Sequence, residues 1–336
     1  MTIQEVKVLL SAPKKIVITS HRNPDGDAIG SSLALYHYLK LYGHTIDVIF
    51  PSEFPPIFEW MPASELITIF DLDTLKSAAL LQNADIIFAL DYNALDRVDK
   101  MGDVMRLLNR TCKIMIDHHR EPELFADFML SDISASSTSE LIYDFIQLLN
   151  DGEKMNTTIG DCIYTGIITD TGSFKFGTSP KLFRTVASLV ELGVQDYRLQ
   201  DIITNCLPEK NLRLLGHALY NRMEILEEYH TGIIYLSKKD YDHFNIQRGD
   251  TEGIVNTMMM IKQIRLAVFM TEQPTIVKLS LRSKGEFNVQ EFCRDHFNGG
   301  GHKNASGGYS YSGLKVTMDK FKNLLPKYKD KLNLNS

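Results

Sequence analysis

Histidine and aspartate residues gather in four short stretches of the sequence that a hydrophobic core does not need. They stand in SHRNPDGDAIGSS (Ser20–Ser32), FALDYN (Phe88–Asn93), IMIDHH (Ile114–His119) and YTGIITDTGSF (Tyr164–Phe174), as His21, Asp25, Asp27, Asp91, Asp117, His118, His119 and Asp170. A single aspartate at the end of an element can be a helix cap, which is worth about 0.5–2 kcal/mol. Four such stretches are better explained by one shared function.

The chemistry that suits these residues is the binding of two divalent cations. Carboxylate oxygens with a minority of imidazoles, and no thiolates, favour Mn²⁺ or Mg²⁺ over a structural zinc ion. Two such ions about 3.5–4 Å apart can activate a bridging hydroxide as the nucleophile and stabilise the leaving oxygen in phosphoryl transfer. One aspartate must then bridge both ions.

The elements that must position these residues form an alternating pattern in the first half. Apolar runs of strand length alternate with helix-length stretches such as Ala28–Leu41 and Ser136–Leu149. The expected strands are Lys15–Thr19, Ile46–Phe50, Ile86–Leu90, Lys113–Ile116 and Phe128–Leu130. This pattern predicts an α/β fold with a mostly parallel, doubly wound sheet. Ligand sites of such sheets form at the carboxyl ends of the strands, where the polar stretches stand.

The second half is expected to form a smaller α/β domain. Two helices, Thr157–Ile168 and Lys181–Leu192, precede a long helix over Leu212–Glu228 that joins the halves. Strands are expected over Gly232–Leu236, Ile264–Met270 and Thr275–Leu281, and a helix over Val289–Phe297 runs into NGGGHKNASGG. We therefore expect a catalytic domain over residues 1–194, a helical linker over 195–228 and a substrate-binding domain over 229–336.

Length, charge and cysteine usage restrict the class of protein. With 336 residues the chain exceeds the usual size of a single core. Its net charge of −6 argues against wrapping a long duplex, which needs many contacts between basic residues and phosphates. The four cysteines form no C-x-x-C pair, and no segment is long and apolar enough for a bilayer. We expect a cytoplasmic protein that does not engage a membrane.

The motifs together resemble the DHH phosphoesterase superfamily. The pattern H-x-x-P-D-x-D-A-x-G-S, the aspartate after a strand, D-H-H and T-D-T-G stand in the family's order at His21–Ser31, Asp91, Asp117–His119 and Thr169–Gly172. The segment FNGGGHKNASGG (Phe297–Gly308) resembles the Gly-Gly-Gly-His signature of the DHH-associated C-terminal domain. Within the superfamily the chain is most similar to the bacterial oligoribonuclease and pAp-phosphatase group, whose members are compact two-domain proteins.

The resemblance implies a set of metal ligands. It assigns the first ion to His21, Asp25 and Asp91. It assigns the second ion to Asp27, Asp91, His118 and Asp170. Asp91 is then the bridging ligand. Asp117 would hold an imidazole in orientation, and His119 would meet the substrate phosphate or the leaving oxygen, with general-acid help.

The resemblance also implies a substrate clamp in the second half. Backbone N–H groups of a glycine-rich turn can surround an anion, which suits Gly299, Gly300 and Gly301 with His302. Arg282 and Ser283 match the family's substrate-binding segment, and arginine offers forked donors for phosphate. We expect this clamp to face the metal cluster across an interdomain cleft and to favour short substrates.

Several functions are compatible with this resemblance. The first is hydrolysis of very short single-stranded RNA to mononucleotides, and of pAp to AMP. The second is hydrolysis of a cyclic or linear dinucleotide. A manganese pyrophosphatase lacks the Gly-Gly-Gly-His segment, and a nucleotide-binding regulator with a vestigial site is expected to lack ligands that are present here. A processive exonuclease would need a longer basic channel. A monomer and a homodimer are both compatible with the sequence.

Overall fold

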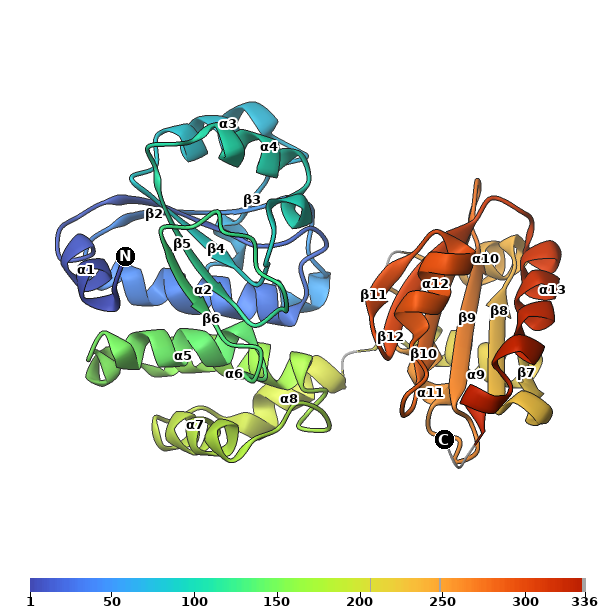
Figure 1. The fold of residues 1–336 in the computed structure, drawn as a ribbon. Coiled ribbons are helices and arrows are strands. Elements are labelled where there is room, and N and C mark those ends of the chain that lie inside the picture. The colour runs from blue at the N-terminus through green and yellow to red at the C-terminus, as the bar shows by residue number, and fades with distance from the viewer. Residues whose placement is uncertain (206, 248, 334–336) are drawn as a thin grey trace. The chain divides into compact units, whose positions relative to one another are not determined.

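The computed structural model describes residues 1–205, 207–247 and 249–333. The chain forms two compact units, residues 1–206 and 207–336 (Figure 1).

The first unit is built on a six-stranded parallel sheet. Its strands are β1 (Lys15–Thr19), β2 (Thr45–Phe50), β3 (Thr68–Ile69), β4 (Ile86–Leu90), β5 (Cys112–Asp117) and β6 (Phe128–Ser131), in the order β3-β2-β1-β4-β5-β6. Central β1 pairs with both β2 and β4, so that Ile16 lies opposite Ile46 and Ile86. The predicted parallel α/β sheet is confirmed. The order of strands reverses beside β1, and such a switch point opens a crevice at the carboxyl ends of the two central strands.

Helices cover both faces of this sheet. They are α1 (Ile3–Leu9), α2 (Gly26–Lys40), α3 (Thr74–Gln82), α4 (Lys100–Leu107), α5 (Thr138–Leu148), α6 (Thr157–Asp170), α7 (Pro180–Glu191) and α8 (Asp196–Thr204). Figure 1 shows α3 and α4 on one side of the sheet and α2, α5 and α6 on the other. The strands are apolar throughout because successive side chains point to opposite faces and both faces are buried.

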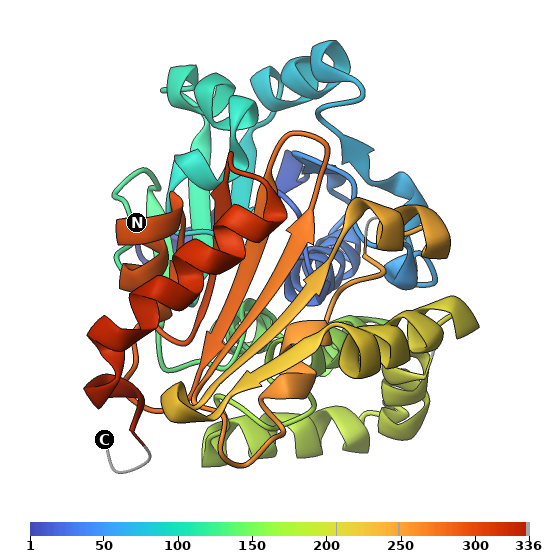
Figure 2. The same ribbon diagram turned by 90° about the vertical axis from the view of Figure 1, so that its right-hand side faces the viewer.

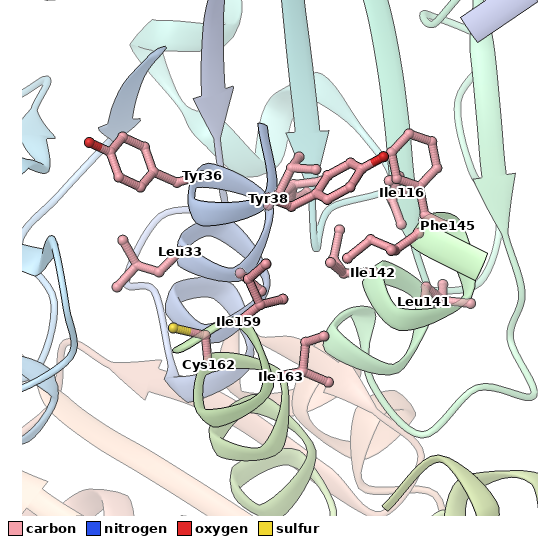
Figure 3. Close-up of a cluster of buried hydrophobic side chains, with 14 of the residues drawn as sticks. Leu33, Tyr36, Tyr38, Ile116, Leu141, Ile142, Phe145, Ile159, Cys162 and Ile163 are labelled. Carbon is pink, nitrogen blue, oxygen red and sulfur yellow. The ribbon is translucent and has the colours of Figure 1, made fainter. Parts of the chain in front are cut away.

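The two buried faces form separate hydrophobic cores. Alternate residues of β1 divide between them: Ile16 and Ile18 join the core under α2, α5 and α6, and Val17 joins the core under α3 and α4. Figure 3 shows the first of these cores, in which side chains of α2, α5 and α6 meet Ile116 of β5. This packing fixes the ends of α2 and α6, which carry polar residues of interest.

The second unit contains a mixed six-stranded sheet. Its strands are β7 (Met223–Leu226), β8 (Thr231–Leu236), β9 (Leu266–Glu272), β10 (Val277–Ser283), β11 (Gly300–His302) and β12 (Ala305–Ser310), in the order β11-β12-β10-β9-β8-β7. Only the β8–β9 pair of this sheet is parallel. The strands can be followed in Figure 2.

Helices pack on both faces of the second sheet. They are α9 (Glu209–Asn221), α10 (Lys238–Phe244), α11 (Ile254–Met258), α12 (Val289–Phe297) and α13 (Leu314–Leu324). Residues of α12 and α13 form one core with Leu279 and Leu281 of β10. Residues of α9, α10 and α11 form the other core with Ile234 and Phe269. Helix α12 has the bounds that the sequence predicts.

The prediction of a long helix over Leu212–Glu228 is wrong. Helix α9 ends at Asn221, and Met223–Leu226 forms strand β7, which pairs with β8 and places Leu226 opposite Thr231. Met223 and Ile225 pack in one core and Leu226 in the other, which is the two-residue period of a strand. A short apolar run next to a helix cannot be assigned from its period alone, because it satisfies both patterns.

The described residues contain no helix with the length and apolar character required to cross a membrane.

Helices α2 and α6 approach each other so closely that glycine is required between them. A Cβ atom at Gly30 would lie 2.6 Å from the carbonyl oxygen of Cys162 and 2.9 Å from the amide nitrogen of Gly166. Both of these are backbone atoms, so that a side chain at Gly30 can be accommodated only by moving one helix away from the other.

We predict that Gly30→Ala lowers the free energy of unfolding of the first unit by about 1–3 kcal/mol, the usual cost of overpacking. Urea denaturation followed by the fluorescence of Trp60, the only tryptophan, measures this. As a control, Gly216→Ala on α9 meets no atom of the described residues within 4 Å. Followed by far-UV circular dichroism, it should stabilise by about 0.4–1 kcal/mol. Equal midpoints for Gly30→Ala and the unmodified protein would contradict the close packing of α2 and α6.

Candidate metal centre

Neighbouring strands of the first sheet bring the acidic and histidine residues to one edge. His21 follows β1, Asp91 follows β4, and Asp117 ends β5 with His118 and His119 directly behind it. Because β1, β4 and β5 are parallel neighbours, their carboxyl ends meet at this edge. The first turn of α2 adds Asp27, its N-cap adds Asp25, and the last residue of α6 adds Asp170.

One group of potential ligands lies after β1. The Nε2 atom of His21 lies 3.3 Å from Oδ2 of Asp91 and 3.8 Å from Oδ1 of Asp25. The other ring nitrogen, Nδ1, lies 2.9 Å from the carbonyl oxygen of Arg22, which fixes the ring and leaves Nε2 directed at the carboxylates. These three side chains present ligand atoms within 4.8 Å of one another, close enough to share one cation.

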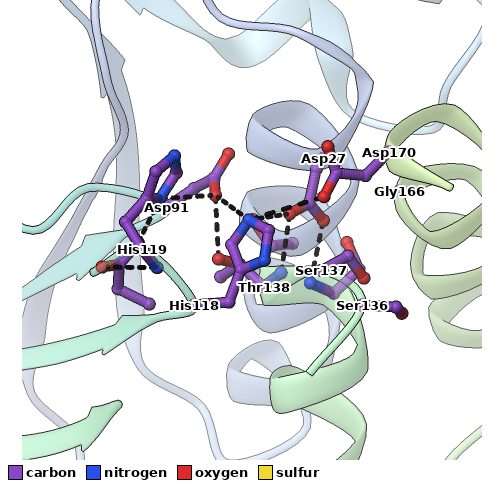
Figure 4. A network of polar contacts seen from close by, with 12 residues as sticks. Asp27, Asp91, His118, His119, Ser136, Ser137, Thr138, Gly166 and Asp170 are labelled. Atoms are coloured by element: carbon purple, nitrogen blue, oxygen red, sulfur yellow. Dashed lines mark hydrogen bonds and ion pairs between the residues drawn. The ribbon is translucent and has the colours of Figure 1, made fainter. Parts of the chain in front are cut away.

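A second group lies around His118 (Figure 4). Its Nε2 atom lies 3.6 Å from Oδ1 of Asp91, 3.5 Å from Oδ2 of Asp170 and 4.0 Å from Oδ2 of Asp27. His118, Asp27 and Asp170 again have ligand atoms within 4.8 Å of one another. The two oxygens of Asp91 therefore face two different groups, Oδ2 toward His21 and Oδ1 toward His118.

His119 lies beside this second group and is held by Asp117. Its Nδ1 atom is 2.7 Å from Oδ1 of Asp117, and its backbone N–H donates to Oδ2 of the same residue at 3.1 Å. Asp117 is completely buried. The Nδ1 atom of His119 also lies 3.8 Å from Oδ1 of Asp91, and His119, His118 and Asp91 form a further group whose ligand atoms lie within 4.8 Å of one another.

The crowded carboxylates of the cluster create a need for positive charge: Asp27 and Asp91 are buried, and Asp170 beside them is exposed. Burial, reinforced by the charges of Asp91 and Asp170, raises the pKa of Asp27 well above its usual value. Partial desolvation of its carboxyl group by the surrounding cluster raises the pKa of Asp170 to about 6, although the charge of His118 opposes this shift. Burial would also raise the pKa of Asp91, but the His21 hydrogen bond and the nearby His118 and His119 outweigh it and lower the value to about 2.

The pKa of His21 reflects the same excess of negative charge. Burial acts to lower the pKa of its imidazole, but hydrogen bonds with Asp25 and Asp91 outweigh burial and raise the value to about 11. Carboxylates that stabilise a protonated imidazole this strongly would also stabilise divalent cations. The donor set, carboxylate oxygens and imidazole nitrogens without a thiolate, fits Mn²⁺ or Mg²⁺.

The backbone of Asp91 is in a conformation that non-glycine residues seldom adopt. Its φ of 64° lies in the left-handed region, and its N–H donates to the carbonyl oxygen of Ile116 on β5 at 3.1 Å. Such strain costs on the order of 1–3 kcal/mol and persists where the surroundings determine it, often at functional sites. The turn directs the Asp91 carboxylate back over the ends of β1 and β5.

The start of α5 supports two of the carboxylates, which sequence reasoning missed. The backbone N–H groups of Thr138 and Ser139 donate to Oδ2 and Oδ1 of Asp27 at 2.6 and 2.8 Å. The Thr138 hydroxyl donates to Oδ1 of Asp91 at 2.9 Å. We predicted a helix here but no role for its first residues. The signal was the run SSTSE, in which Ser137 caps the helix and accepts from the Glu140 N–H at 3.0 Å.

Small residues let these helices reach the cluster. A Cβ atom at Gly166 of α6 would lie 2.7 Å from Oδ1 of Asp27 and would overlap the Ser139 hydroxyl. A Cβ atom at Gly26 would overlap the side chain of Thr169. Glycine at these two places therefore allows α2, α5 and α6 to converge behind the carboxylates (Figure 4).

The residues expected to bind substrate lie in the second unit. Arg282 of β10 pairs across the sheet with Ala305, and Ala305 pairs with His302, so Arg282 and His302 share one face. Ser283 lies on the opposite face, where its hydroxyl donates to the Phe287 carbonyl oxygen at 2.6 Å. The glycine-rich segment is not the expected turn around an anion: Gly300–His302 forms edge strand β11, because its backbone pairs with β12.

Known proteins resemble the chain along most of its length. Bifunctional oligoribonuclease and PAP phosphatase NrnA of Thermus thermophilus is 29% identical over 302 residues, covering 90% of this chain and 86% of the relative. Its Bacillus subtilis counterpart is 28% identical, covering 88% and 90%. The cyclic-di-AMP phosphodiesterase PdeA of Listeria monocytogenes is 24% identical, covering 89% of this chain and 45% of that protein.

Two solved structures extend the comparison. An exopolyphosphatase-related protein from Bacteroides fragilis has a TM-score of 0.95 at 37% sequence identity, covering 98% of this chain and 97% of the other. RecJ of Thermus thermophilus, solved in complex with Mn²⁺, shares the fold with a TM-score of 0.59 at 12% identity, covering 98% of this chain and 55% of RecJ.

Two family models account for both units of the chain. Residues 15–167 match the N-terminal domain of the DHH family, and residues 228–333 match the DHHA1 domain. The first match contains Asp91 and the DHH sequence Asp117–His119, and the second contains the Gly-Gly-Gly-His segment. The chain thus belongs to the DHH family of phosphoesterases, with a DHH domain followed by a DHHA1 domain.

Proposed function

We propose that the protein uses two divalent cations, Mn²⁺ or Mg²⁺, to hydrolyse very short RNA to mononucleotides and pAp to AMP. The observation that carries this proposal is the Asp91 carboxylate, whose Oδ2 lies 3.3 Å from the His21 ring and whose Oδ1 lies 3.6 Å from the His118 ring. A carboxylate shared by two groups of ligands is what a two-metal site requires. The likeness to the NrnA proteins supports the choice of substrate.

We assign the ligands as two sets that share Asp91. His21, Asp25 and Asp91 would hold one ion. The other ion would be held by Asp27, Asp91, His118 and Asp170. When bound, two such ions supply Lewis acidity at the phosphate and lower the pKa of a water molecule. Asp117 would keep the His119 ring in place, and His119 would contact the phosphate or give a proton to the leaving oxygen.

The start of α5 would hold two carboxylates of the cluster in position. Two backbone N–H groups fix both oxygens of Asp27, and the Thr138 hydroxyl occupies one lone pair of Asp91 Oδ1. The carboxylates are then aimed before an ion arrives, so that binding does not have to order them. Partners of this kind typically change metal affinity by about 10–100-fold when removed.

Residues of the DHHA1 domain would bind the rest of the substrate. We propose that Arg282 and His302 contact a phosphate, as arginine offers two parallel donors to its oxygens. In this division of labour the first unit carries the chemistry and the second unit binds substrate; much of the expected linker over residues 195–228 is replaced by α9 and β7, which belong to the second unit. Ser283 would contribute by holding the turn after β10, since its hydroxyl is already bonded to Phe287.

A second candidate is hydrolysis of a dinucleotide. The observation that favours it is the 24% identity to the cyclic-di-AMP phosphodiesterase of Listeria monocytogenes. This chain covers only 45% of that protein, whereas it covers 86% and 90% of the two NrnA proteins. The shorter RNA-degrading relatives therefore remain the better guide.

We predict a steep dependence on substrate length. With Mn²⁺, kcat/KM should be high on RNAs of two to five nucleotides and on pAp, and should fall steeply on an RNA of 24 nucleotides. It should depend only weakly on salt, because few phosphates are contacted. Steady-state rates on this ladder and on cyclic di-AMP, at low and moderate salt, provide the measurement. Equal efficiency on the longest RNA would favour a processive exonuclease, and a preference for cyclic di-AMP would favour the second candidate.

We predict that Thr138→Ala weakens Mn²⁺ binding about 10–100-fold and lowers kcat/KM, because Oδ1 of Asp91 loses its hydroxyl donor. Thr138→Ser keeps the hydroxyl and should restore most of both quantities. Isothermal titration with Mn²⁺ gives the affinity independently of activity, and circular dichroism checks the fold. Alanine and serine variants with the same affinity as the unmodified protein would show that the start of α5 has no positioning role.

A further inference from the structure

One face of the DHHA1 sheet combines cationic and aromatic side chains with bare backbone. Along β10, the residues on this face are Lys278, Ser280 and Arg282, which alternate with residues buried against α12. The strand register pairs them on β12 with Tyr309, Gly307 and Ala305, respectively. Directly opposed residues of an antiparallel pair point to the same side, so these six positions form one surface.

Edge strand β11 continues the same surface. Gly300 lies opposite Gly307, and His302 lies opposite Ala305. The surface therefore has three rows: His302, Ala305 and Arg282 in the first, Gly300, Gly307 and Ser280 in the second, and Tyr309 and Lys278 in the third. Toward β9 the surface ends at Phe269, which is buried under α9, α10 and α11.

The glycines of this region divide into two kinds. Gly299 and Gly308 are required by the fold: a Cβ at Gly308 would lie 2.8 Å from the Phe297 carbonyl oxygen, and one at Gly299 would overlap the Gly307 carbonyl oxygen. Gly300 and Gly307 are not. A Cβ at Gly300 would meet no atom of the described residues within 4 Å, and one at Gly307 would make a single ordinary contact, 3.7 Å from the Leu279 carbonyl oxygen.

Gly300 and Gly307 face each other across the strands, and glycine at two such positions lowers the stability of the sheet. Glycine weakens a strand relative to residues with a side chain, and in strands it often marks the close approach of a ligand. The backbone of Gly300 and Gly307 is thus uncovered on this face, and we call these two residues the floor of the surface. Arg282 and His302 stand at one end of this floor, and Lys278 and Tyr309 stand at the other.

The charge of this surface is entirely basic. Within β10, β11 and β12, all of which the structure describes, no acidic residue occupies a position on this face. Lys278 is exposed and Tyr309 is half-buried beside it, and Tyr311 contacts the Tyr309 ring edge-on with centroids 5.5 Å apart. Along the strand, Lys278 and Arg282 are separated by four residues, or about 13 Å.

We propose that the Gly300–Gly307 floor and the Lys278–Tyr309 pair form a second nucleotide subsite, for the nucleotide next to the one whose phosphate Arg282 and His302 contact. The base would stack on the Tyr309 ring, which accepts any base because each has a π-face. The ribose would lie on the bare backbone of Gly307, and Lys278 would contact the next phosphate. This inference rests on the proposed function and specifies how the same protein distinguishes oligonucleotides from mononucleotides.

The first test uses two neighbouring glycines of β12. Gly307→Val places a side chain on the floor, and its Cβ fits the sheet, so that the melting temperature should stay the same or rise. The KM for a trinucleotide should nevertheless rise about ten-fold or more. Gly308→Val is the matched control: it collides with Phe297 and should lower the melting temperature. A Gly307→Val protein with unchanged KM would overturn the subsite.

The second test concerns stacking. Tyr309→Ala should raise the KM for the trinucleotide about ten-fold, as expected for the loss of one stacked base, while Tyr309→Phe should keep it. Neither variant should change the hydrolysis of bis(4-nitrophenyl) phosphate, which has no second nucleotide. Tyr220→Ala, at a tyrosine 90% exposed on α9, serves as the control for loss of a surface tyrosine. Equal KM values for Tyr309→Ala and Tyr220→Ala would contradict the stacking role.

Binding separates this inference from the proposed activity. The affinity of the 336-residue chain for a fluorescein-labelled trinucleotide is measured by anisotropy in EDTA, where no metal-dependent hydrolysis occurs. Weaker binding by Gly307→Val and Tyr309→Ala, in a protein that cleaves no RNA with Mn²⁺, would leave the subsite standing and refute the activity. Cleavage of RNA with unchanged binding and KM in both variants would refute the subsite and leave the proposed activity standing. A protein that neither binds nor cleaves the trinucleotide overturns both.

Discussion

The mutual repulsion of three crowded carboxylates, the buried Asp27 and Asp91 and the more exposed Asp170, is the constraint on which the rest of the structure depends. They meet around His118, with Nε2 distances of 4.0, 3.6 and 3.5 Å, in surroundings where charge is expensive. Positive charge must enter the cluster to offset this repulsion. Protons on the imidazoles can supply it, and two divalent cations would supply it more fully. The first unit is arranged to hold these carboxylates together against their tendency to separate.

Each element contributes one restraint to that arrangement. Parallel strands place Asp91 and Asp117 at one edge, and the left-handed turn at Asp91 directs its carboxylate over the neighbouring strands. Glycines at the contacts of α2, α5 and α6 remove the side chains that would keep the helices apart. The N–H groups at the start of α5 then fix Asp27. Together these restraints hold the carboxylates in place.

The sequence was sufficient for features that depend on local pattern. Apolar runs such as Ile86–Leu90 predicted the sheet, and the motif around His21 and the D-H-H sequence predicted the family. It was insufficient where the deciding contact is distant in sequence: β7 is a strand because β8 lies beside it, and Thr138 matters because Asp91, 47 residues away, lies within reach of its hydroxyl. Likewise, only the contacts of Gly308 with Phe297 and of Gly299 with the Gly307 carbonyl oxygen distinguish the glycines that the fold requires from Gly300 and Gly307.

The number of metal ions bound per chain tests the central claim most directly. Isothermal titration of the metal-free 336-residue chain with Mn²⁺, compared with Asp91→Asn, gives that number without reference to any substrate. We predict two ions per chain for the unmodified protein, and loss of high-affinity binding at both positions in Asp91→Asn with an unchanged circular dichroism spectrum, because one carboxylate serves both ions. A single ion in the unmodified protein, or one ion retained at full affinity by Asp91→Asn, would contradict the shared role of Asp91.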